Sequence, residues 1–195
     1  MWTTVVDYLS ARRADAEEWT NGRNALVRLP LLAYLVYAGI RHLADPMYRS
    51  WFAGVTLVFH EMGHLLFSAF GHTLMILGGT ILQLLVPTAA ALYLVLRQRD
   101  YFGGAVGGAW LSYSLWEMAT YVSDANKDAL PLVGFGSNPE HDWGTLLTEW
   151  HLLNSCDTFA TGIRVIAFVV WGASMVAAAW LCWLMWKSLD SKVAR

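Results

Sequence analysis

The stretch from residue 51 to residue 70, WFAGVTLVFHEMGHLLFSAF, constrains the fold more than any other part of the chain. It is apolar and about as long as the 20 helical residues that cross the hydrocarbon of a bilayer. His60, Glu61 and His64 interrupt it near its middle. Ionisable side chains are costly at that depth and normally face protein or a water-filled cavity, where they have a function. The stretch therefore predicts a membrane helix that carries a polar site on one face.

The composition agrees with this prediction. Of the 195 residues, 56% are hydrophobic and only 14% are charged, and the mean hydropathy is +0.41. Soluble domains usually contain more charge and less apolar surface. The net charge of -2 includes no long run of like charges, so we expect no nucleic-acid partner. No repeat or low-complexity tract divides the chain, which predicts a single membrane-embedded domain over residues 1–195.

The apolar segments predict an all-α, polytopic membrane protein with about five transmembrane helices. The polar segment 1–24 lacks the apolar core and cleavage site of a signal peptide, so we expect it to lie at the membrane interface. The connection 123–162 is too long for a turn, and we expect it to contribute an interfacial or re-entrant helix between the fourth and fifth spans. The expected spans are residues 26–40, 51–70, 73–96, 101–122 and 163–186.

His60 and His64 have the spacing that places two side chains on one helix face, one turn apart. Two imidazoles at this spacing are able to bind one metal ion, and Glu61 is placed to act as the general base on a metal-bound water. This HExxH pattern is typical of zinc hydrolases, so we expect zinc as the cofactor and Glu61 as the catalytic residue. A pair of histidines that only bond to neighbouring helices is the structural alternative.

A catalytic zinc site needs a third protein ligand. Asp124 ends the fourth expected span on the side of the membrane that the histidines approach, and the connection after it carries His141 and Asp142. We expect Asp142 to bind the metal directly, with His141 as the close alternative and Asp124 as a carboxylate that orients a histidine. Glu117 is the alternative if none of the three lies near the histidines.

Two further polar residues are candidates for the site. His72 follows Gly71 in a short turn on the same side and is a candidate to line the entrance. Gln83 lies in the third expected span, where it is placed to hydrogen-bond a substrate or a ligand from outside the metal shell. Small residues beside it, Gly78 and Gly79, more often serve close packing of membrane helices.

The sequence HEMGH, followed by GHTLMILGGTILQLLVP, resembles the site-2 protease class of intramembrane zinc metallopeptidases over about residues 55–90. The resemblance implies that His60 and His64 bind zinc and that Glu61 activates water to hydrolyse a peptide bond in or near the bilayer. The third ligand of that class is an aspartate in an LDG or NPDG sequence, and this chain contains neither. The later segments YVSDA and HDWGTLL are similar to a bacterial branch of related membrane proteins, which favours Asp124, His141 and Asp142.

Three functions remain open at this stage. The first is a metallopeptidase acting on a membrane protein or peptide, and the second is a zinc hydrolase acting on a lipid amide or ester. The third is a non-enzymatic protein that binds metal. In each case we expect a multi-pass protein of a bacterial or archaeal cytoplasmic membrane, and no sequence feature indicates an oligomeric state.

Overall fold

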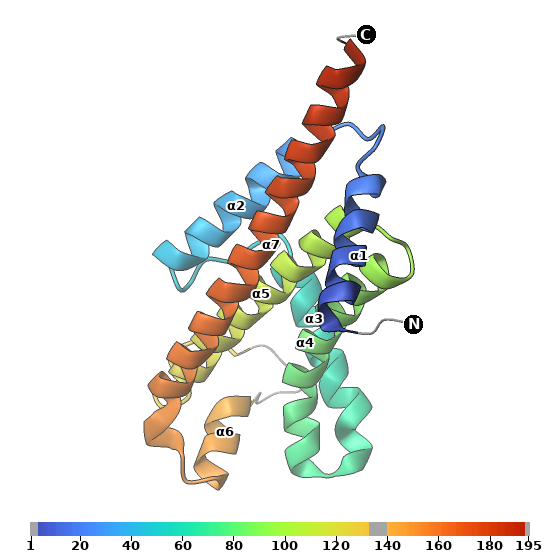
Figure 1. Cartoon of the computed structure of the whole chain (residues 1–195). Coiled ribbons are helices and arrows are strands. Elements are labelled where there is room, and N and C mark those ends of the chain that lie inside the picture. Colours follow the sequence, from blue (N-terminus) through green and yellow to red (C-terminus); the bar gives the residue numbers. More distant parts are fainter. Residues whose placement is uncertain (1–3, 133–139, 194–195) are drawn as a thin grey trace.

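The computed structural model describes residues 4–132 and 140–193. It is 80% helical, and its described residues contain no strand, which confirms the all-α expectation. Two 3-10 turns, η1 and η2, separate neighbouring helices (Figure 1). The elements in chain order are α1 Val5–Trp19, α2 Leu29–Ala44, α3 Ala53–Phe67, η1 Ser68–Phe70, α4 His72–Leu96, α5 Tyr101–Asp124, α6 Asp142–Glu149, η2 Leu153–Ser155 and α7 Cys156–Val193.

The helix ends follow local capping chemistry. Asp100 begins α5, where its carboxylate accepts a hydrogen bond from the backbone N–H of Gly103 at 3.0 Å, one of the donors that a helix start leaves unpaired. Gly71 precedes α4 with a φ of 94°, a conformation that a side chain would strain. This glycine allows the chain to reverse between η1 and α4, so that α3 and α4 form a hairpin.

Among the described residues, two helical segments are long and apolar enough to cross a membrane, namely His72–Leu96 and Leu153–Ser188. This is fewer than the five expected spans. At 1.5 Å per residue, the 16 residues of α2 reach about 24 Å, which is less than the roughly 30 Å of hydrocarbon. The 15 residues of α3 fall short for the same reason. The last helix also begins earlier than expected, at Cys156 instead of residue 163.

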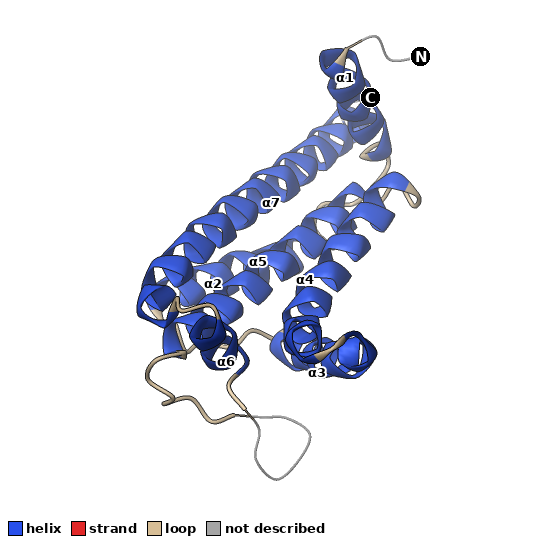
Figure 2. Cartoon of the chain, turned by 90° about the horizontal axis from the view of Figure 1, so that it is seen from below, coloured by secondary structure: helices blue, strands red, loops and turns tan. Residues whose placement is uncertain are grey.

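Helix α5 lies at the centre of the bundle, between α4 and α7 (Figure 2). Small residues on α5 allow this close approach. A Cβ on Gly107 would lie 2.8 Å from that of Ala91 on α4, and a Cβ on Gly108 would collide with Ser174 on α7. Close approach through small residues is the usual packing mode of helices in membranes.

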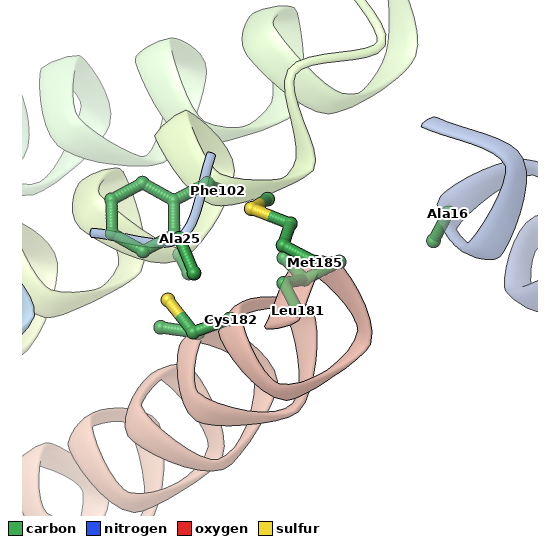
Figure 3. Packing of buried hydrophobic residues seen from close by; sticks show 8 residues of the cluster. Ala16, Ala25, Phe102, Leu181, Cys182 and Met185 are labelled. Carbon is green, nitrogen blue, oxygen red and sulfur yellow. The ribbon is translucent and has the colours of Figure 1, made fainter. Parts of the chain in front are cut away.

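A cluster of buried residues joins α1, the segment before α2, α5 and α7. Figure 3 shows Ala16, Ala25 and Phe102 around the α7 residues Leu181, Cys182 and Met185. The expected interfacial segment 1–24 therefore contains a helix, α1, whose Ala16 packs against the bundle. This cluster lies at the end of the bundle opposite α6, and the turn of the α3–α4 hairpin lies at the same end as α6 (Figure 1).

Candidate metal centre

The hairpin of α3 and α4 brings two backbones into direct contact. A Cβ on Gly63 of α3 would overlap the backbone of Gly78 on α4, and a Cβ on Gly78 would lie 2.7 Å from that of Phe67. Gly79 faces the imidazoles of His60 and His64. The glycines therefore let α3 rest on α4 with both histidines held in the contact between the two helices.

Asp142 approaches both imidazoles at the start of α6. Its Oδ2 lies 2.9 Å from Nε2 of His60 and 3.3 Å from Nε2 of His64. Burial raises the pKa of the Asp142 carboxyl, but hydrogen bonds to the two imidazoles, which need a proton on each Nε2, outweigh burial and hold that pKa below its ordinary value. Asp142 is therefore a carboxylate while the imidazoles are protonated, and its Oδ2 faces Nε2 of both rings.

The other nitrogen of each imidazole is also engaged. Nδ1 of His60 lies 2.9 Å from Oε1 of Gln83, and Nδ1 of His64 lies 3.0 Å from the carbonyl oxygen of Met75. The amide group of Gln83 is oriented in turn, because its Nε2 donates to the carbonyl of Ser114 at 3.1 Å. Both oxygens are acceptors, so Nδ1 of each ring is the donor.

This tautomer has a consequence for the centre of the site. With its proton on Nδ1, a neutral imidazole presents a lone pair at Nε2. Two such lone pairs then face the negative oxygen of Asp142 at 2.9 and 3.3 Å, an arrangement that is repulsive unless positive charge lies between them. The site therefore requires a cation, either protons on the imidazoles or a metal ion.

Asp142 is positioned by the start of α6 and by α5. The hydroxyl of Tyr121 accepts a hydrogen bond from the backbone N–H of Asp142 at 3.0 Å. Nδ1 of His141 accepts from the backbone N–H of Gly144 at 3.1 Å and so caps α6. The ring of Tyr121 stacks on the ring of His141, with 4.2 Å between the two ring centroids. These contacts hold the first turn of α6 against α5.

The structure does not place His141 where a ligand is needed. Its Nδ1 is used for the cap, and its Nε2 lies 3.6 Å from Oδ2 of Asp124. Nor does Asp124 orient either site histidine, because its carboxylate accepts from the backbone N–H groups of Ala129 and Leu130 at 3.0 to 3.2 Å. In the described structure both residues therefore contact the connection that carries Asp142, and the roles expected for them at the metal stay predictions.

Glu61 lies next to the converging donor atoms. One ligand atom each of His60, Glu61 and His64 lies within 4.8 Å of the others. Glu61 and His60 also line a cavity of about 130 Å³ between α3, α4, α5 and the segment around Trp143. Glu61 is thus placed to contact both a bound ion and a molecule in the cavity.

The remaining residues predicted for the site are Gln83, Glu117 and His72, and they differ in what they contact. Gln83 bonds to His60. Glu117 lines the same cavity from α5. His72 is exposed and lies outside the group, with its Nε2 3.5 Å from Oε1 of Glu149 on α6. His72 therefore links α4 to α6, and its expected place at the entrance of the site stays a prediction.

Three contributors were not predicted from the sequence. The carbonyl of Met75 is a backbone group and carries no side-chain signal. Gly79 was assigned only to helix packing, although its lack of a side chain also makes room for the imidazoles. Tyr121 had a signal, because it lies four residues after Glu117 and three before Asp124 on one polar stripe of α5.

The donor set fits a zinc ion. Ligands about 2.0 to 2.1 Å from a tetrahedral metal lie about 3.3 Å from one another, close to the separations of Asp142 from His60 and His64. Two imidazoles and one carboxylate also suit zinc better than the oxygen-seeking Mg²⁺ or Ca²⁺.

No family model, curated protein or solved structure matches the chain.

Proposed function

We propose that the protein is a membrane-embedded zinc hydrolase of the metallopeptidase type, with His60, His64 and Asp142 as metal ligands and Glu61 as general base. The observation that carries the proposal is the approach of the Asp142 carboxylate to Nε2 of both His60 and His64, while Nδ1 of each ring contacts an acceptor oxygen. The likeness of HEMGH and its flanks to the site-2 protease class supports the same assignment.

Each residue has a chemical role in amide hydrolysis. When bound, zinc supplies Lewis-acid polarisation of the scissile carbonyl and lowers the pKa of water. Glu61 accepts a proton from the attacking water as the new C–O bond forms. It then gives that proton to the leaving nitrogen as the C–N bond breaks. Gln83 and the carbonyl of Met75 keep the protons of His60 and His64 on Nδ1, so that both Nε2 atoms stay available.

We further propose that α2, α3, α4, α5 and α7 all lie within the bilayer. Exposed apolar side chains support this arrangement, because large apolar patches on a surface mark contact with lipid or another protein. On α3 these include Val55, Val58 and Leu65, and on α7 they include Val169 and Val176, each at least half exposed. The short helices α2 and α3 are compatible with local thinning of the bilayer or with ends that reach only the interface.

The experiment that tests the proposal is metal analysis and turnover of detergent-purified protein. We expect one zinc per chain in the parent and in Glu61→Gln, and little zinc in His64→Ala. With a degenerate library of fluorescence-quenched peptides, Glu61→Gln should lose at least about 100-fold in turnover. A parent protein without stoichiometric metal would exclude the proposal. Retained turnover in Glu61→Gln would favour a metal-binding protein without this chemistry.

A further inference from the structure

Glu117 is a carboxylate in the middle of α5 that no described residue satisfies. Its Oε1 is buried and has no hydrogen-bond partner within the described part of the chain. It lines the same cavity as Glu61 and His60. Buried polar atoms normally have a partner, and an exception asks for an explanation.

Burial of an unpaired carboxylate is expensive. An ionised carboxylate in this position costs several kcal/mol even after relaxation, and a neutral carboxyl with an unpaired acceptor still costs about 1–3 kcal/mol. Arg49 also lines the cavity, but it is exposed and forms no ion pair with Glu117 among the described residues. The fold therefore gains no stability from Glu117, which points to a molecule in the cavity as its partner.

The cavity has the size and lining for an extended side chain. Its volume of about 130 Å³ corresponds to roughly four water molecules at about 30 Å³ each. Leu57, Met118 and Leu132 contribute apolar surface, while Glu117 and Glu61 contribute carboxylates. A ligand that satisfies this lining has an aliphatic stem and an end rich in N–H donors.

Building on the proposed function, we infer that this cavity binds a lysine or arginine side chain of the peptide substrate, next to the scissile bond, with Glu117 as the residue that selects it. The cation neutralises the buried carboxylate and donates to Oε1, and the stem packs on the apolar lining. The peptide backbone then lies beside Glu61 and the metal ligands. Glu117 is thus a specificity-determining residue, because it contacts the substrate without taking part in the proton transfer.

The first test measures binding to metal-free protein, so that it does not depend on catalysis. The probes are N-acetyl-lysine methylamide and its neutral counterpart, N-acetyl-norleucine methylamide, titrated by calorimetry into the full chain in detergent. We expect the lysine probe to bind at least about tenfold more tightly. Glu117→Gln should remove that difference, whereas Glu18→Gln, which changes an exposed carboxylate on α1 far from the cavity, should retain it.

Equal affinity for the two probes in the parent, or a preference that survives in Glu117→Gln, would overturn the inference. Displacement of the lysine probe by phosphatidylethanolamine nanodiscs, but not by phosphatidylcholine nanodiscs, would overturn it in favour of a lipid amine. A preference for the lysine probe in a protein that holds no zinc after purification would instead refute only the proposed zinc-hydrolase function. A zinc-loaded, active protein without the preference would refute only the role of Glu117.

Discussion

A Cβ atom on Gly79 would lie 2.6 Å from Nε2 of His64 and 2.8 Å from Cε1 of His60. The backbone of α4 thus forms the wall against which both imidazoles rest. Any side chain at this position would occupy the space that the two rings now fill, because real Cβ contacts are not found below about 3.0 Å.

Replacement of Gly79 by alanine is therefore expected to displace both imidazoles and to weaken zinc binding by at least about 100-fold, more than an outer-shell change usually costs. Zinc stoichiometry and a competition titration with a chelator measure the effect. Gly54→Ala on α3 is the matched control, because a Cβ at Gly54 would meet no described atom within 4 Å apart from its chain neighbours and the backbone of its own helix. Zinc binding unchanged in Gly79→Ala would contradict the assigned position of the metal.

Substitutions at His141 and Asp142 test which of these neighbours binds the metal and which caps helix α6. Asp142→Asn removes the negative charge between the two imidazoles and is expected to lower zinc affinity by at least about 100-fold. His141→Asn keeps a residue type that caps helices well, so it should retain stoichiometric zinc. If the pattern is reversed, with zinc lost only in His141→Asn, the assignment of Asp142 as third ligand is wrong.

Gln83→Met removes the acceptor that holds the proton of His60 on Nδ1. We expect zinc affinity to fall by about 10- to 100-fold, the usual effect of losing an oriented partner behind a metal ligand. Gln98→Met serves as the control, since Gln98 is exposed and its amide donates to the hydroxyl of Tyr93 at 2.8 Å, away from the site. Equal affinities in the two variants would show that Gln83 does not orient His60.

Glu117→Met should stabilise the protein, because it replaces a carboxylate whose Oε1 is buried and unpaired with an apolar side chain of similar length. The expected gain in the free energy of unfolding is about 1–3 kcal/mol, measured as a rise in the melting temperature in detergent. The exposed residue Glu18 gives the comparison, and Glu18→Met should change stability by no more than about 0.5 kcal/mol. A strong loss of stability in Glu117→Met would instead assign Glu117 a structural partner.

The fold was predictable where apolar length and turn residues coincide. The bounds of α4 and α5 lie within two residues of the expected spans, because Gly71 and Asp100 mark their starts. The apolar pattern overestimated α3, which continues as the 3-10 turn η1 instead of a full α-helix. Sequence hydropathy also does not distinguish an apolar helix that faces lipid from one that packs in a bundle. The sequence therefore predicted five spans, whereas two described helical segments meet the length and composition of a span.

The approach of Asp142 to His60 and His64 was predictable, since spacing fixes the two histidines and the topology returns the connection to their side of the bundle. Metal binding by these residues stays a prediction. The roles of His141 and Asp124 were not predictable, because a histidine cap depends on backbone directions that residue types do not encode. The same holds for Met75, whose carbonyl is aimed at His64 by the path of α4 and not by its side chain.

The third proposed ligand belongs to a different helix from the other two, and this couples metal capture to the docking of α6 on α3 and α4. By thermodynamic reciprocity, the factor by which docked α6 tightens the metal equals the factor by which the metal tightens docking. Contacts that never touch the ion, such as that between His72 on α4 and Glu149 on α6, then contribute to metal retention through this shared equilibrium.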